Sequence, residues 1–243
     1  MIAQIWQWLT ASSSWTGTDG IPVRVGEHLW YSFVVVVIAA LIAIPTGLYV
    51  GHTGRARWLI AAANAARAVP TLGLLFALAL WLGPHIRGAL AFSVPSITAL
   101  VLLAVPPILA GAFAGVEAVD PAVRDAAEAM GMPPQAVVWH VEVPNALPLI
   151  LSGLRSAVLQ VIATATIAAY IGLGGLGRFL IDGLASADYP QTAGGALLVA
   201  LLALILDGVL AVVQRLVVSP GVDGRAARRS RRGKVSRRVD VAA

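Results

Sequence analysis

Five long apolar runs constrain the fold of this chain more than any other feature. A helix needs about 20 predominantly apolar residues to cross the hydrocarbon core of a bilayer, and each run is long enough. Charged residues make up 12% of the chain, roughly half the share of about 25% found in soluble domains. The sequence therefore predicts an all-α integral membrane protein with about five transmembrane helices. The predicted spans are Leu29–Val50, Trp58–Leu82, Leu90–Val116, Pro148–Ile171 and Thr192–Val218.

Basic residues between these runs predict how the chain is oriented, because cytoplasmic segments carry an excess of lysine and arginine. Five spans place the two termini on opposite sides. With a cytoplasmic C-terminus, the inner side holds Arg55, Arg57, Arg124 and the eight basic residues of Arg225–Arg238, whereas the outer side holds Arg24, Arg87 and Arg178. We therefore expect the N-terminus outside and the C-terminus in the cytoplasm.

Three parts are expected along the chain. Residues 1–28 form an extracytoplasmic segment, in which Trp6, Trp8 and Trp15 are typical of a short amphipathic helix at the membrane surface. Residues 29–218 form the transmembrane domain, with a cytoplasmic loop at 117–147. Residues 219–243 form a basic cytoplasmic tail with little to bury, which predicts disorder. Beside the inner leaflet its charges favour membrane lipid over nucleic acid as a partner.

Several kinds of chemistry are excluded or disfavoured by the residues that the chain lacks. It has no cysteine, and therefore no disulfide, thiolate metal site or cysteine nucleophile. Its single lysine, Lys234, does not stand in the G-x-x-x-x-G-K-[ST] pattern of a nucleotide-binding P-loop. No two of its four histidines are three or four residues apart. We predict no catalytic residue, no metal site and no cofactor, so ATP would have to be bound by a partner chain.

A polar stretch between residues 117 and 147 interrupts the apolar runs. Asp120 suits the N-cap of a short helix, Pro121 its first position, and Gly131 the left-handed residue that follows its end. Pro133-Pro134 is expected to start a second short helix, and Pro144 to stop it before the next span. Two short helices joined at a glycine predict a compact elbow that a partner could approach closely. An ordinary amphipathic loop is the alternative.

The same stretch resembles the EAA signature of binding-protein-dependent ABC importer permeases. Asp125-Ala126-Ala127 is followed by Gly131 and, after nine intervening residues, by Val141-Glu142-Val143-Pro144. Asp125 stands where glutamate is usual, and Val141 and Val143 stand where isoleucine and leucine are usual. Further segments, among them "ARAVPTLGLLFAL", "ATATIAAYIGLGGLGRFLIDGL" and "LLALILDGVL", are similar to the branch that transports the osmoprotectants glycine betaine, carnitine and choline.

This resemblance implies a type I ABC importer permease, a multi-pass protein of the bacterial cell membrane. Such permeases work as homo- or heterodimers with an ATPase subunit and an extracytoplasmic substrate-binding protein, and the loop is the coupling helix that docks on the ATPase. ATPase coupling is thereby assigned to Asp125, Ala126, Ala127, Gly131 and Pro144. The substrate implied is a small osmoprotectant. The first alternative is an importer of another small solute, such as an amino acid or methionine. The second, which the sequence favours less, is a secondary transporter.

The segment Gly172–Gly177 contains the pattern G-x-G-x-x-G. A dinucleotide-binding fingerprint of this form must follow a strand, but here it follows a predicted spanning helix, so we reject that function. We expect a tight turn or gate near the outer mouth of the translocation path, formed by Gly172, Gly174, Gly175 and Gly177. A plain connecting loop is the alternative.

Three charged residues within the predicted spans, Arg67, Arg155 and Asp207, are expected to interact. With a helical rise of about 1.5 Å per residue, all three lie at broadly similar depth. Because an unpaired ion inside a membrane is costly, we predict that Asp207 pairs with Arg155 or Arg67 inside the bundle. Extension of each arginine side chain to the inner interface is the alternative.

Overall fold

The computed structural model describes residues 1–88 and 90–218, and these residues form helices and connecting turns without a strand. Four helical segments are long and apolar enough to cross a membrane: α3 (Ile21–Thr53), α6 (Leu90–Glu117), the segment Pro134–Ile171 that contains α9 (Val143–Ala168), and α11 (Tyr189–Val217). The pair α4 (Trp58–Ala66) and α5 (Thr71–Leu82) supplies a fifth, bent segment. The all-α membrane fold predicted from the sequence is confirmed.

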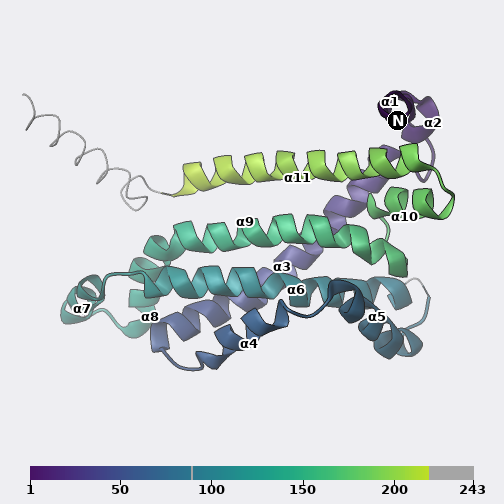
Figure 1. Ribbon diagram of the computed structural model, residues 1–243. Coiled ribbons are helices and arrows are strands. Elements are labelled where there is room, and N and C mark those ends of the chain that lie inside the picture. The colour runs from purple at the N-terminus through teal and green to yellow at the C-terminus, as the bar shows by residue number, and fades with distance from the viewer. Residues whose placement is uncertain (89, 219–243) are drawn as a thin grey trace, which may run out of the picture.

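Shorter helices lie at the two ends of an elongated bundle (Figure 1). At one end are α7 (Pro121–Ala129) and α8 (Pro134–Val137), and α11 ends at this same end of the bundle. At the other end are α1 (Ile2–Thr10), α2 (Ser12–Trp15) and α10 (Gly177–Ala185). Two 3₁₀ turns, Gly83–His85 and Ala169–Ile171, and a π-helix, Val138–Glu142, complete the helical elements described. The polar loop and the glycine segment are therefore separated by the length of the bundle.

The centre of the bundle is α6, which packs between α3 and α9. Two glycines let α6 and α9 cross at close range. A Cβ added to Gly111 would lie 2.7 Å from the carbonyl oxygen of Leu149, and one added to Gly153 would lie 2.6 Å from that of Pro107. Small residues at helix crossings are the usual means of tight packing inside a membrane. The polar loop connects α6 to α9, so this tight crossing fixes the positions of the two helices that flank the loop.

Four of the five predicted spans coincide with helices that differ from them only at their ends. The first begins earlier than predicted, at Ile21 instead of Leu29, so the boundary between residues 28 and 29 lies within α3. The N-terminal amphipathic helix is present as α1. Its Trp8 packs edge-on against Phe179, with the ring centroids 5.2 Å apart, so α1 contacts the bundle as well as solvent. The predicted disordered tail, 219–243, lies outside the described residues.

The predicted span over Trp58–Leu82 is a bent pair of helices in the structure. α4 and α5 meet at an angle of 95°. After α4 the amides of Arg67, Ala68 and Val69 each donate to the carbonyl three residues earlier, which tightens the last turn. Pro70 then adopts an extended conformation (φ −60°, ψ 125°) and begins α5. Pro70 has no amide hydrogen, and its ring disfavours a helical conformation of the residue before it, so the helix breaks here.

Candidate functional site

The helix α7 has the two ends that its sequence predicts. The Asp120 side chain accepts a hydrogen bond from the amide of Ala122 at 2.9 Å, which satisfies one of the free donors of the first turn. At the other end Gly131 is left-handed, with φ +85°. The amide of Gly131 donates to Glu128 and that of Met132 to Ala127, which is the paired arrangement of a Schellman motif. The chain therefore turns sharply after α7.

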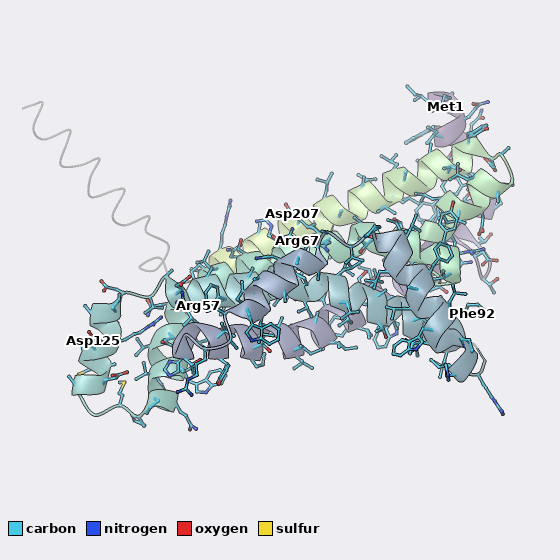
Figure 2. All side chains as sticks on the ribbon, turned by 60° about the horizontal axis from the view of Figure 1, so that its bottom comes forward. Met1, Arg57, Arg67, Phe92, Asp125 and Asp207 are labelled. Carbon is cyan, nitrogen blue, oxygen red and sulfur yellow. The ribbon has the colours of Figure 1, made fainter. Side chains whose placement is uncertain are left out.

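The residues of the EAA-like signature differ in exposure. Asp125, Ala126 and Gly131 are exposed at the end of the molecule, whereas Ala127 is only 2% exposed and packs inward. Figure 2 shows Asp125 at the far end of the structure from Met1. The outer face of α7 thus presents a carboxylate and a methyl group, with no bulky side chain at Ala126. A protein surface could approach this part of the helix backbone closely.

The prediction that Pro144 ends a second short helix was wrong. The helix that begins at Pro134 continues through the π-helix Val138–Glu142 directly into α9. Pro144 lies in the first turn of α9, where the π-helical turn leaves room for a residue without an amide donor. The elbow therefore has one sharp corner, at Gly131, and a rigid second arm that is the start of a spanning helix.

A buried carboxylate beneath the elbow was not predicted from the sequence. The side chain of Glu142 is fully buried. Its Oε2 lies 3.0 Å from Nδ1 of His52, and its Oε1 lies 3.0 Å from Nε of Arg124. The only signal in the sequence is an acid among apolar residues in "VVWHVEVP". Its partners are far away along the chain, so no local spacing could have identified them.

Of the three charged residues predicted to interact within the spans, the structure brings two together. Arg155 on α9 donates from Nε and Nη2 to the two carboxylate oxygens of Asp207 on α11, at 2.5 and 2.6 Å. In the part of the chain that the structure describes, Arg67 forms no ion pair and its side chain is exposed. Arg67 and Asp207 both lie between the two ends of the molecule in Figure 2. The Arg155–Asp207 pair therefore joins α9 to α11. Arg67 lies at the α4–α5 break and takes no part in this pair.

The glycine segment forms a turn against the start of α3, and its backbone needs glycine for two reasons. Gly172 and Gly175 are left-handed, with φ +94° and +88°. A Cβ on Gly174 would lie 2.5 Å from Oε2 of Glu27, and one on Gly177 would lie 2.5 Å from the carbonyl oxygen of Thr166. The amide of Gly175 donates to Oε2 of Glu27 at 2.8 Å. The segment is thus a tightly packed turn attached to α3.

An apolar cavity of about 780 Å³ adjoins this turn. It lies between α5, the start of α6 and Gly172, and three of its walls are the aromatic rings of Phe76, Phe92 and Tyr170. Figure 2 shows Phe92 at the end of the molecule opposite Asp125. Over the described residues, no group of three or more histidine, aspartate or glutamate side chains is arranged to hold a metal ion.

The amino-acid sequence is similar to known transport proteins over most of its length. Residues 36–219 match the family described as "Binding-protein-dependent transport system inner membrane component". The chain is 33% identical to the glycine betaine/carnitine/choline transport system permease protein OpuCB of Bacillus subtilis, over 83% of this chain and 90% of that protein. It is 34% identical to the osmoprotectant import permease protein OsmW of Salmonella typhimurium, over 81% of this chain and 91% of that protein.

The fold is also similar to those of solved transporters. The inward-facing MetNI methionine ABC transporter contains a chain that superimposes with a TM-score of 0.69, over 82% of this chain and 96% of that chain, at 23% identity. An amino acid ABC transporter with histidines gives a TM-score of 0.62, over 81% of this chain and 91% of that chain, at 21% identity. At these identities the likeness shows a shared fold.

Proposed function

The chain belongs to the family of binding-protein-dependent transport system inner membrane components, and from this premise we propose that it is one half of a dimeric importer pore for a small osmoprotectant. It is a multi-pass membrane permease subunit of an ABC importer, with the architecture of a type I importer permease. Such a subunit is not an enzyme. It works with an ATPase and a substrate-binding protein, and ATP is bound by the ATPase.

The substrate class that we propose follows from the named relatives. Those that match over most of their length are permeases for glycine betaine, carnitine and choline, or for osmoprotectants, at 32–34% identity. The structural neighbours that transport methionine and amino acids are only 21–23% identical, and they support the fold without favouring those substrates. We therefore favour an osmoprotectant over an amino acid as the substrate. We also favour an ABC importer over a secondary transporter as the class of protein.

The exposed face of α7 is the proposed docking surface for the ATPase, and its geometry is the single observation that carries this assignment. Asp125 and Ala126 are exposed beside the sharp corner at Gly131, at one end of the bundle. Ala127 packs inward and holds the helix in place. Pro144 contributes indirectly, since it lies at the start of α9 and not on the docking face.

We further propose that this end faces the cytoplasm and that the glycine turn faces outward. The basic residues favour this orientation, and the elbow and the end of α11 lie at the same end of the molecule (Figure 1), as the orientation requires. The turn at Gly172, Gly174, Gly175 and Gly177 then borders the outer mouth of the path, beside the aromatic-lined cavity. The tail, 219–243, would contact the lipid of the inner leaflet.

The translocation path is proposed to lie between this chain and a second permease subunit, either an identical copy or a paralogue. Residues 67–70 form an irregular, exposed stretch between α4 and α5, and Arg67 within it has an exposed side chain. Irregular backbone and charge at membrane depth occur where protein covers them or where they line a water-filled cavity. A position facing lipid would be unfavourable, so the break faces the partner or the path.

The docking assignment is tested by co-purification of the permease with a candidate ABC ATPase subunit from the same organism. Ala126→Arg places a bulky charge on the exposed face of α7 and should abolish association, while the permease remains inserted in the membrane. Gln7→Arg adds the same charge at an exposed position on α1, at the opposite end, and should have no effect. Normal association of the Ala126→Arg variant would show that the ATPase docks elsewhere.

A further inference from the structure

The coupling helix α7 has little packing of its own to hold it on the bundle. Ala127 is its single buried residue, and it offers one methyl group. Movement of the ATPase can change the pore only if α7 and the transmembrane helices are mechanically coupled. Some other contact has to make α7 and the spans move as one body.

Arg124 supplies that contact. Its Nη2 donates to the carbonyl oxygen of Val116 in the last turn of α6, and its Nε forms an ion pair with Glu142 at 3.0 Å. Arg124 directly precedes the exposed residues of the docking face. One side chain therefore connects the docking helix both to α6 and to the segment that leads into α9.

Glu142 extends this connection to a third span. Its fully buried carboxylate also contacts Nδ1 of His52, in the last turn of α3, at 3.0 Å. The residue ends the π-helix, in which the amide of Val143 donates to the carbonyl of Val138. Single π-helical turns are frequent at functional sites. This one allows Pro144 to enter α9 while an acid occupies the junction of α3, α7 and α9.

We propose that Glu142, held by Arg124 and His52, is the positioning residue that transmits movement of α7 to the spans. The proposal rests on the docking function assigned to α7 above. The buried carboxylate of Glu142 resists separation from Arg124 and His52, because it would lose contacts that compensate for its removal from water. The end of α3, the end of α6 and the start of α9 therefore move together when the ATPase moves α7.

The first experiment compares transport with ATP hydrolysis in the complete importer reconstituted in liposomes. Glu142→Gln keeps the size of the side chain and removes its charge. This variant should still co-purify with the ATPase, because the docking face is unchanged. ATP hydrolysis should continue, but substrate imported per ATP should fall by about tenfold or more. Arg124→Lys, which keeps the charge but loses the fork geometry, should retain an intermediate amount of transport.

A matched control is available in the same region. Arg57 and Glu117 form an ion pair of 3.2 Å between the start of α4 and the end of α6, and both side chains are at least half exposed. An exposed pair contributes little to stability. Glu117→Gln makes the same chemical change as Glu142→Gln and should leave transport per ATP unaltered. Equal losses in the two variants would mean that removing either acid from this region has the same effect, whether or not the acid is buried, and would overturn the proposal.

A second experiment does not depend on the ATPase. Because the chain has no cysteine, spin labels can be attached at Glu128→Cys on α7 and Thr53→Cys on α3, both exposed. The distance distribution between the labels should be narrow in the otherwise unaltered permease and broad after Glu142→Gln or Arg124→Gln. A narrow distribution in either well-inserted variant would show that α7 is held by other contacts, and the proposal would be wrong. If the unaltered permease does not bind the ATPase, the docking function fails, and the label distances still test the link.

Discussion

Two charged residues that the sequence marks as unusual, Arg155 and Asp207, meet between α9 and α11. The bidentate geometry, with N–O distances of 2.5 and 2.6 Å, uses both carboxylate oxygens and two guanidinium nitrogens. In a membrane the alternative to pairing is an isolated ion in an apolar environment. Such a contact also fixes the rotation of α11, which is otherwise sparsely buried.

We expect Arg155 and Asp207 to be energetically coupled. Arg155→Leu and Asp207→Asn should each lower the thermal unfolding temperature of the detergent-purified permease, because each leaves the other residue without its partner. The double variant should recover at least half of the larger loss. The measurement is a double-mutant cycle. Strictly additive losses would show that the two side chains do not depend on each other.

Some of the contacts between individual residues could be predicted from the sequence, and others could not. A charge in an apolar run is conspicuous, so the Arg155–Asp207 contact could be predicted, although the choice between Arg155 and Arg67 needed the fold. The cap at Asp120 and the turn at Gly131 follow from local backbone chemistry. The role of Glu142 could not be identified, because an acid between two valines does not show which distant residues it will contact. Only the tertiary arrangement buries it between helices that are distant in sequence.

Among the elements, the break between α4 and α5 is the feature that a hydropathy pattern conceals. Both helices are apolar, and their combined length suits one span. Proline alone does not decide the outcome: Pro45 in α3 and the three prolines of α6 lie within continuous helices. At Pro70 the preceding turn has already tightened, with three successive bonds to the carbonyl three residues earlier. The bend results from this combination, and no single residue predicts it.

We predict that Pro70→Ala impairs transport more than Pro45→Ala does. Alanine at position 70 restores an amide donor and relieves the restriction on Val69, which favours a straight helix through the break. A straightened span would alter the face presented to the second subunit. Transport by the reconstituted importer should fall by about tenfold or more in Pro70→Ala, with membrane insertion retained.

The outcome for the control follows from its helix. Pro45→Ala substitutes an exposed residue in a helix that is already continuous, and it should leave transport within about twofold of the unaltered protein. Similar transport in the two variants would show that transport does not depend on the 95° bend.

At the scale of the whole molecule, two of the exposed surfaces of the described chain differ in kind. The face of α11 is regular helix with long aliphatic side chains, such as Leu204, which is 68% exposed. The face at the α4–α5 break has irregular backbone, small residues and Arg67. Lipid accommodates the first surface and not the second. This contrast is what places the path and the second subunit on the side of α4 and α5 in our proposal.

Water accessibility distinguishes these two surfaces directly. In the cysteine-free chain, Ala68→Cys at the break and Leu204→Cys near the middle of α11 each introduce one exposed thiol. Only a thiol in contact with water ionises readily and reacts with a charged methanethiosulfonate reagent. We expect the cysteine at position 68 to be modified at least about tenfold faster than the one at position 204 in the assembled importer. Addition of glycine betaine with its binding protein and ATP should change the rate at position 68 alone, because that position would lie along the path. Equal and slow modification of both would mean that the break is sealed against a neighbouring subunit, and the path would then have to be sought along another face of the bundle.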